Sequence, residues 1–302
     1  MARKEVTVSA TLIPIRVDCK ETAATCEDRD AIVFVHGIYG GEDTFFNKDT
    51  NFNWPEELPY SYRGQPVDVF FLKYQTELIS WARGTNVKFK DLNATLYQVL
   101  KPLRMRQYRS IIFICHSLAG IVMASYIHYV KTKRGHPAAS QNACLITLAT
   151  PVLGAQVANI GSFLKSILGM SDQLLESLKK NNIFLEMLLE FRKAENEKRE
   201  LYKCRPVSLH AAYEQEYLGP LLIVPRESAD NPIVGLTSSP IVGFQLDHSE
   251  ISKPTDRNHE VYRWVNQIID KEFVRLELWS MMVFNQPKDR KLCLDIPFKR
   301  ET

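Results

Sequence analysis

The sequence predicts an α/β fold in which a mostly parallel central sheet carries helices on both faces. Short apolar runs typical of buried strands alternate with longer stretches of helical periodicity, an order that favours parallel strands joined by helices. One apolar run also passes through an abrupt corner straight into an apolar helix. The strand-like runs lie at 31–35, 111–114, 144–149, 207–213, 221–224 and 241–246, and the helical stretches lie at 90–104, 120–133 and 171–193.

Length and composition indicate one large globular domain. The chain has 302 residues, of which 45% are apolar and 24% charged, as is ordinary for a folded protein with a sizeable core. We expect a single domain over 1–302, with a helical cap inserted at 160–203 and a C-terminal extension at 271–302. The net charge of +3 gives no reason to expect binding to nucleic acid.

The first elements are an edge strand and a buried strand that ends in glycines. Residues 7–17 are rich in β-formers and predict a strand at the edge of the sheet. The apolar run 31–35 leads into His36-Gly37, and Gly40-Gly41 follow shortly after. Because glycines let the backbone turn sharply, they leave main-chain amides exposed in this loop, which His36 is expected to order.

The corner at residues 115–119 predicts a nucleophilic serine. A buried strand ends here, and Gly120 opens an apolar helix. Such a turn holds a serine hydroxyl above the sheet edge and needs small residues two positions before and two after the serine. The common pattern is G-x-S-x-G, whereas Ser117 is flanked at those positions by Cys115 and Ala119, both of which are small. The alternative is that Ser117 merely caps the helix.

Attack by Ser117 on a carbonyl would require two N–H groups aimed at the oxygen that becomes negative. One donor comes from the residue after the nucleophile, here Leu118, and the other from the loop after an earlier strand. Ile38, just beyond the glycine that ends the first buried strand, is the expected second donor. The alternative is a glycine-rich turn that binds nothing.

These motifs resemble the α/β-hydrolase fold, and more narrowly the lipase-like group that contains the serine active site-containing proteins and the GPI inositol deacylases. The resemblance runs from about residue 31 to residue 269. It implies a catalytic serine, acid and histidine in that order along the chain, and lipid acyl esters as the substrate class. The blocks that carry it are 34–38, Trp54-Pro55, 115–120, Ala149-Thr150-Pro151 with Gly154, 224–229 and 247–254.

A histidine on the loop after the last strand should be the general base, because this is where such a fold places it. His248 fits, since it follows the run 241–246 and precedes a helix expected over 258–270. His116, next to the serine, is expected to hold the elbow instead, and His259 to lie on the surface. The remaining histidines have no motif around them: His128, His136 and His210.

The acid has two main candidates. Glu214 lies at the end of the strand 207–213 and matches the glutamate of this group's strand-end pattern. Glu227, in the following loop, is its rival, and Asp230 and Asp247 are weaker alternatives. A carboxylate at either place would orient His248 and stabilise its charged form.

The insertion at 160–203 contains leucines and phenylalanines at helical spacing. They predict amphipathic helices that either pack on the sheet or cap Ser117 and form an acyl-chain pocket. Further on, apolar residues are dense between 273 and 284, where they could finish the core, bind a partner or rest on a membrane surface.

Together these observations predict a serine esterase or lipase that acts through an acyl-enzyme on Ser117, with His248 and Glu214 completing the triad. Ile38 and Leu118 form the expected oxyanion hole, and neither a cofactor nor a metal is expected. An acyltransferase with the same triad, or a non-catalytic effector module on the same fold, are the alternatives.

The expected partner is an ester or lipid substrate, with peripheral contact to a membrane but none to nucleic acid, and the oligomeric state stays open. The first residues are polar, with no apolar core of a signal peptide behind them, and no apolar run approaches the ~20 residues that span a bilayer. We therefore expect a cytoplasmic location, where the cysteines would be reduced. The six cysteines show no metal-ligand spacing: Cys19, Cys26, Cys115, Cys144, Cys204 and Cys293.

Overall fold

The computed structural model of this protein describes most of the central sheet and the helices around it. The described residues are 9–18, 29–37, 40–74, 89–105, 108–133, 143–150, 207–217, 226 and 240–284. Several expected features therefore lie outside the described residues: the cap insertion at 160–203, the helical stretch 171–193, the strand 221–224, and the residues Ile38, Glu227 and Asp230.

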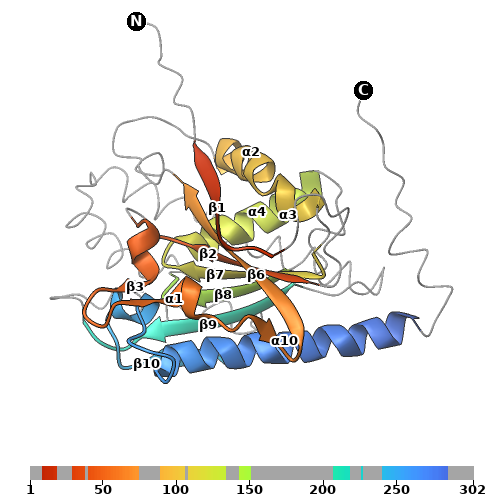
Figure 1. The fold of residues 1–302 in the computed structure, drawn as a ribbon. Coiled ribbons are helices and arrows are strands. Elements are labelled where there is room, and N and C mark those ends of the chain that lie inside the picture. The colour runs from red at the N-terminus through yellow and green to blue at the C-terminus, as the bar shows by residue number, and fades with distance from the viewer. Residues whose placement is uncertain are drawn as a thin grey trace, which may run out of the picture.

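The core of the fold is a mostly parallel sheet, as predicted (Figure 1). Its strands follow the order β1-β6-β2-β7-β8-β9-β10, and every neighbouring pair from β6 to β10 is parallel. β1 lies at the edge and pairs antiparallel with β6, which confirms the predicted edge strand. The strands are β1 (Ala10–Arg16), β2 (Asp30–Val35), β6 (Gln65–Tyr74), β7 (Ser110–His116), β8 (Ala143–Leu148), β9 (Ser208–Glu214) and β10 (Val242–Phe244).

Short elements complete the chain between β2 and β6 and before the last helix. β5 (Ser61–Tyr62) pairs antiparallel with the start of β6, and β3 (Phe46–Asn47) pairs with β4 (Phe52–Asn53). A 3-10 helix, η1 (Glu42–Phe45), precedes β3, α1 (Trp54–Glu57) follows β4, and a second 3-10 helix, η5 (Glu250–Ser252), follows β10.

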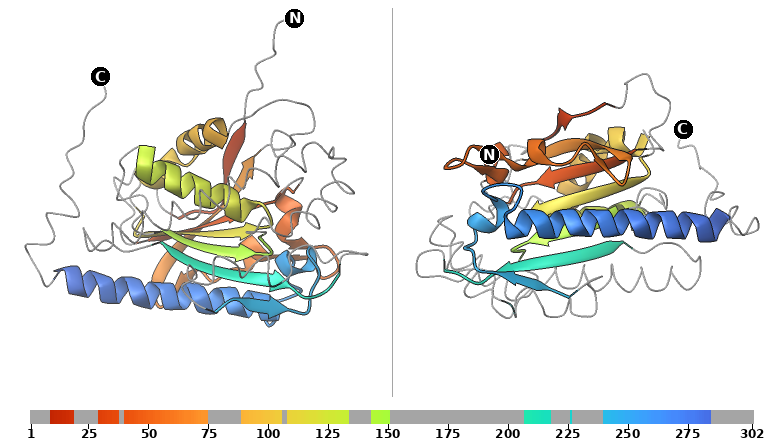
Figure 2. Two further views of the ribbon diagram at one scale, coloured as in Figure 1. Left: turned by 180° about the vertical axis from the view of Figure 1, so that it is seen from behind. Right: turned by 60° about the horizontal axis from the view of Figure 1, so that its bottom comes forward.

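Helices cover both faces of the sheet because its central strands are apolar on both sides. Along β2, Ala31, Val33 and Val35 pack on one face, while Ile32 and Phe34 pack on the other. The first face is covered by α2 (Phe89–Val99), α3 (Lys101–Met105) and α4 (Ala119–Lys133), and the second by α1 and the long α10 (Glu260–Phe284). Figure 2 shows α10 running along the sheet on the side opposite α4.

Two elements differ from the sequence-based expectation. The strand β6 was not foreseen, because Asp68 and Lys73 interrupt its apolar run, although Asp68 is fully buried in the structure. The helix expected over 90–104 is divided into α2 and α3. Pro102 explains the division, since proline has no N–H with which to continue the hydrogen-bond ladder.

The C-terminal helix α10 begins near the expected position and continues well beyond residue 270. The boundary expected at 271 therefore falls inside α10, where Glu272 and Phe273 are buried against the sheet. Among the described residues, no helix has both the length and the apolar composition to cross a membrane.

Buried ion pairs lie where the parallel strands begin, at the end of the sheet opposite to Ser117. The carboxylate of Asp68, with no exposed surface, accepts hydrogen bonds from Arg29, from the Tyr108 hydroxyl at 2.7 Å and from the Asp18 N–H at 3.0 Å. Asp30, equally buried, pairs with Arg109. These contacts satisfy charges that would otherwise be costly to bury in the sheet.

Candidate active site

Ser117 lies on a sharp turn between the end of β7 and the start of α4. Its backbone has a φ of +55°, in the left-handed region that residues other than glycine rarely adopt. Hydrogen bonds to β8 and to the residues after it hold the turn: the Ser117 N–H donates to the Leu148 carbonyl at 2.9 Å, and the Thr150 hydroxyl donates to the Ser117 carbonyl at 2.7 Å. The flanking small residues, Cys115 and Ala119, are fully buried, so larger side chains would not fit there.

His248 meets this serine from the loop after β10. Its Nε2 atom lies 3.0 Å from Ser117 Oγ, and its ring is almost fully buried. The loop is fixed by Asp247, whose Oδ1 accepts the N–H groups of Ser249 at 2.7 Å and Glu250 at 2.9 Å. Asp247 thus holds the turn that leads into η5 and orients the backbone that carries His248.

Glu214 lies on the other side of the imidazole, at the end of β9. Its Oε2 is 2.7 Å from His248 Nδ1, and the residue has no exposed surface. An ionised carboxylate can only accept a hydrogen bond, so it fixes the proton on Nδ1 and leaves the lone pair of Nε2 directed at the Ser117 hydroxyl. The structure therefore brings together Ser117, His248 and Glu214, whereas Asp247, a weaker candidate for the acid, binds main-chain N–H groups instead.

Of the two expected oxyanion donors, Leu118 and Ile38, the structure describes only Leu118. Among the described residues, no hydrogen bond uses the N–H of Leu118, which directly follows the nucleophile. The loop after β2 approaches the same point, because a Cβ atom added to Gly37 would lie 2.8 Å from Ser117 Cβ and 3.4 Å from its Oγ. Ile38, the expected second donor, adjoins Gly37 but lies outside the described residues.

His36 anchors this loop to the neighbouring strand β6. Its Nε2 accepts the N–H of Tyr74 at 3.2 Å, so Nδ1 carries the proton and donates to the Gly37 carbonyl at 2.8 Å. The Tyr74 hydroxyl in turn donates to the His36 carbonyl at 2.9 Å. Burial lowers the pKa of His36, which keeps the ring neutral and suited to this structural role.

His116 makes a contact that the sequence did not indicate. Its Nε2 lies 2.7 Å from the main-chain carbonyl oxygen of His248, to which the neutral ring donates. Burial, with the neighbouring His248 as a smaller cause, lowers the pKa of His116 to about 3. The residue before the serine was expected to hold the elbow, and its side chain in fact joins the elbow to the loop of His248.

These contacts define a serine whose proton can pass to a buried, oriented imidazole. An adjacent base within hydrogen-bond reach, itself held by a third group, is the arrangement that turns a hydroxyl into a nucleophile. Free main-chain N–H groups beside the serine oxygen would stabilise a tetrahedral oxyanion. The described residues thus bring together a serine hydroxyl, an imidazole within hydrogen-bond reach of it, and a carboxylate that orients the imidazole.

Comparison with known proteins yields one family and several structural likenesses. The family model described as "Putative serine esterase (DUF676)" matches residues 27–190, just over half of the chain. The mature form of a lipase from Bacillus licheniformis is 18% identical, with 81% of this chain and 92% of the lipase covered and a TM-score of 0.45. A fungal esterase from Rhizomucor miehei is 15% identical, with 91% of this chain and 85% of the esterase covered and a TM-score of 0.46. The comparison with curated proteins gives no match.

Proposed function

Because the chain belongs to the family of putative serine esterases DUF676, we propose that it hydrolyses carboxylic esters through an acyl-enzyme formed on Ser117. The observation that carries this proposal is the continuous line from Ser117 Oγ through the imidazole of His248 to the carboxylate of Glu214, with separations of 3.0 and 2.7 Å. Esterase-type hydrolysis fits the family.

In the first half of the reaction, Ser117 Oγ attacks the acyl carbonyl while His248 Nε2 takes its proton. Glu214 stabilises the imidazolium that forms, and the N–H groups of Leu118 and Ile38 bind the oxyanion. Collapse of the tetrahedral intermediate transfers the proton from His248 to the leaving alcohol and leaves the acyl group on Ser117. In the second half, His248 activates a water molecule, which releases the acid and restores the serine.

We further propose lipid acyl esters as the substrate class. Two observations support it: the resemblance of the sequence blocks to the lipase-like group, and the apolar side chains at helical spacing in the insertion at 160–203, which would line an acyl-chain pocket. A substrate of this kind would bring the protein to a membrane surface, and sedimentation with phosphatidylcholine vesicles would detect that contact.

A fluorophosphonate probe tests the nucleophile directly, because it modifies only an activated serine. We expect the wild-type protein to be labelled and Ser117→Ala to remain unlabelled, with ester hydrolysis lower by about 10⁴-fold or more. A folded wild-type protein that neither labels nor hydrolyses any ester would contradict the proposal and favour the non-catalytic module.

A second measurement separates hydrolysis from acyl transfer. p-Nitrophenyl esters of increasing chain length would be offered with and without a lipid alcohol as acceptor, and the products analysed by mass spectrometry. Free fatty acid as the main product in both cases supports the hydrolase, whereas an acylated lipid would identify an acyltransferase. A preference for short acyl chains would contradict the lipid substrate without affecting the esterase assignment.

A further inference from the structure

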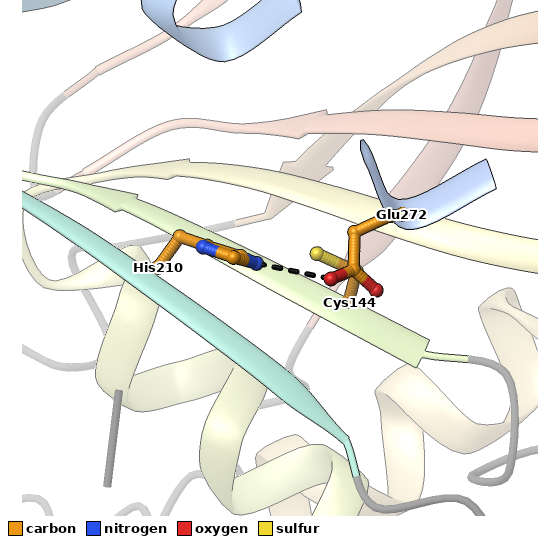
Figure 3. A group of neighbouring side chains, drawn as sticks. All are labelled: Cys144, His210 and Glu272. Carbon is orange, nitrogen blue, oxygen red and sulfur yellow. Dashed lines mark hydrogen bonds and ion pairs between the residues drawn. The ribbon is translucent and has the colours of Figure 1, made fainter. Parts of the chain in front are cut away.

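A second cluster of buried polar side chains lies between the sheet and α10. It consists of Cys144, His210 and Glu272, and the potential ligand atoms of the three residues all lie within 4.8 Å of one another (Figure 3). Each residue is at most 5% exposed. Sulfur, imidazole nitrogen and carboxylate oxygen gathered in one buried place are the ligand types that zinc takes in proteins.

The strand register explains why these side chains meet. Cys144 pairs with Ser208 and Ile146 pairs with His210 in the parallel ladder of β8 and β9, so Cys144 and His210 point to the same face of the sheet. This is the face that α10 covers, and α10 supplies Glu272. The cluster lies near the beginning of β8 and β9, whereas Glu214 lies at the far end of β9, so it is separate from the candidate active site.

The Glu272 carboxylate is held in a defined orientation. The Ser208 hydroxyl donates to Oε2 at 2.6 Å, while Oε1 faces His210 Nε2 at 3.2 Å. Arg275, one turn further along α10, contacts both the Ser208 hydroxyl and Oε1, the latter at 3.3 Å. Partners of this kind, which fix the direction of a ligating carboxylate, are common around protein metal sites.

We propose that Cys144, His210 and Glu272 bind a zinc ion that fastens α10 to β8 and β9. Zinc–ligand bonds of about 2.0–2.3 Å in tetrahedral geometry place neighbouring ligand atoms roughly 3.3–3.8 Å apart. In the cluster, His210 Nε2 and Glu272 Oε1 are 3.2 Å apart, and all three ligand atoms lie within 4.8 Å of one another. A thiolate and a carboxylate bring two negative charges, which a divalent cation would neutralise, while Arg275 adds a further positive charge beside Glu272. A water molecule would complete the fourth position.

The proposed ion has a structural role, because the site is buried and no substrate could reach it. Binding releases the thiol proton of Cys144 to solvent, leaves the ring proton of His210 on Nδ1, and replaces the hydrogen bond between His210 Nε2 and Glu272 Oε1 with a bond from each residue to the ion. The competing explanation is a hydrogen-bonded anchor without metal, in which His210, Ser208 and Arg275 alone hold Glu272. The two explanations differ in metal content and in the response of the melting temperature to a chelator.

The experiment uses the full chain purified without a histidine tag or a metal column. We expect one zinc ion per chain by plasma mass spectrometry, and a lower melting temperature after treatment with a chelator. After exchange with Co²⁺, a thiolate charge-transfer band in the near ultraviolet should appear. Cys144→Ala and Glu272→Gln should each lose the metal and the band, whereas Cys115→Ala, which removes a buried thiol from the adjacent strand β7, should keep both.

Each of the following results would contradict the proposed zinc site. Absence of metal, together with a melting temperature that neither zinc nor chelator changes, would leave only the hydrogen-bonded anchor. Metal that persists in Cys144→Ala and Glu272→Gln would lie elsewhere in the chain. If Cys144→Ala fails to fold by circular dichroism, Glu272→Gln decides, because it keeps the size of the side chain and an acceptor for Ser208.

Discussion

The imidazole of His116 donates a hydrogen bond of 2.7 Å to the main-chain carbonyl of His248. His116, the residue before Ser117, therefore holds the loop that carries His248. The two rings lie with their centroids 4.9 Å apart. Because Ser117 and His116 are adjacent in the chain, this contact fixes the position of the His248 backbone relative to Ser117, whose hydroxyl bonds the His248 ring. His116 is thus a positioning residue for the candidate triad.

Removal of the His116 donor should misplace His248. We expect His116→Leu to lower kcat more than it changes KM, and to destabilise the fold by about 1–3 kcal/mol, because the buried carbonyl of His248 loses its hydrogen bond. His116→Gln keeps a side-chain donor and should retain much of the activity. Steady-state kinetics and urea unfolding of the two variants measure these effects, and equal kcat values in both would contradict the positioning role.

Acid should destabilise the protein through the same residue. The pKa of His116 is about 3 in the fold and near its ordinary 6.5 when unfolded, so the unfolded chain binds more protons between these values. The contribution of His116 to the free energy of unfolding is therefore fully present above pH 6.5. It decreases as the pH drops towards 3, by up to about 1.4 kcal/mol per pH unit. Urea unfolding across this range should show a smaller slope for His116→Gln than for the wild type. Parallel curves would show that His116 does not contribute.

Ester hydrolysis should depend far more on Glu214, whose carboxylate contacts His248, than on the exposed Glu216 nearby. Glu214→Gln leaves the shape of the side chain unchanged but no longer fixes the His248 tautomer, so kcat should fall by about 10⁴-fold. Glu216→Gln is the matched control, since Glu216 is exposed and only two residues away. Ester hydrolysis by both variants, together with Glu227→Gln, tests the assignment. The acid is Glu227 if that variant alone loses activity.

Gly37 should tolerate no side chain. A Cβ atom there would lie 2.8 Å from Ser117 Cβ and 3.1 Å from the His116 carbonyl oxygen, so Gly37→Ala must push the loop and the elbow apart. We expect kcat/KM to fall on the order of 100-fold, because small displacements of reacting groups have large effects on rate. Gly41→Ala, whose Cβ would meet nothing closer than 3.4 Å, should behave like the wild type. Similar activities for the two variants would argue against an oxyanion loop at this place.

The buried Asp68 should contribute to stability and not to activity. Asp68→Asn leaves Arg29 near the sheet without its main counter-charge and should reduce the free energy of unfolding by about 3–5 kcal/mol. Asp18 contacts the same arginine at 3.5 Å but is 65% exposed, so Asp18→Asn should cost about 0–1 kcal/mol. Chemical denaturation measures both changes, and a loss for Asp18→Asn as large as that for Asp68→Asn would contradict this explanation.

Local patterns in the sequence were sufficient for most of the sheet and for the placement of the candidate triad. Strands such as β2 and β7 are apolar on both faces, so their runs stand out. Glu214 is the last residue of its strand, and Ser117 and His248 come shortly after the ends of theirs. Parallel strands bring such ends to one edge of a sheet, which is why three residues distant in sequence could be expected to meet there.

Features that depend on contacts between distant segments could not be predicted in this way. β6 was missed because its Asp68 looks unfavourable in a buried strand until Arg29 and Tyr108 are known to pair with it. The same holds for His210, which showed no surrounding motif. Its neighbours Cys144 and Glu272 come from another strand and from α10, and no spacing in the sequence relates the three.

The backbone of Ser117 has a consequence for how this site can change over evolutionary time. The left-handed backbone conformation of Ser117 costs about 1–2 kcal/mol of folding free energy for a residue with a Cβ atom, whereas glycine adopts it without this cost. Exchange of this one serine for glycine should therefore stabilise the fold and, under the proposed mechanism, abolish ester hydrolysis. Selection for thermal stability alone would favour glycine at position 117 and remove the proposed nucleophile. Stability and catalysis therefore favour different residues at this position.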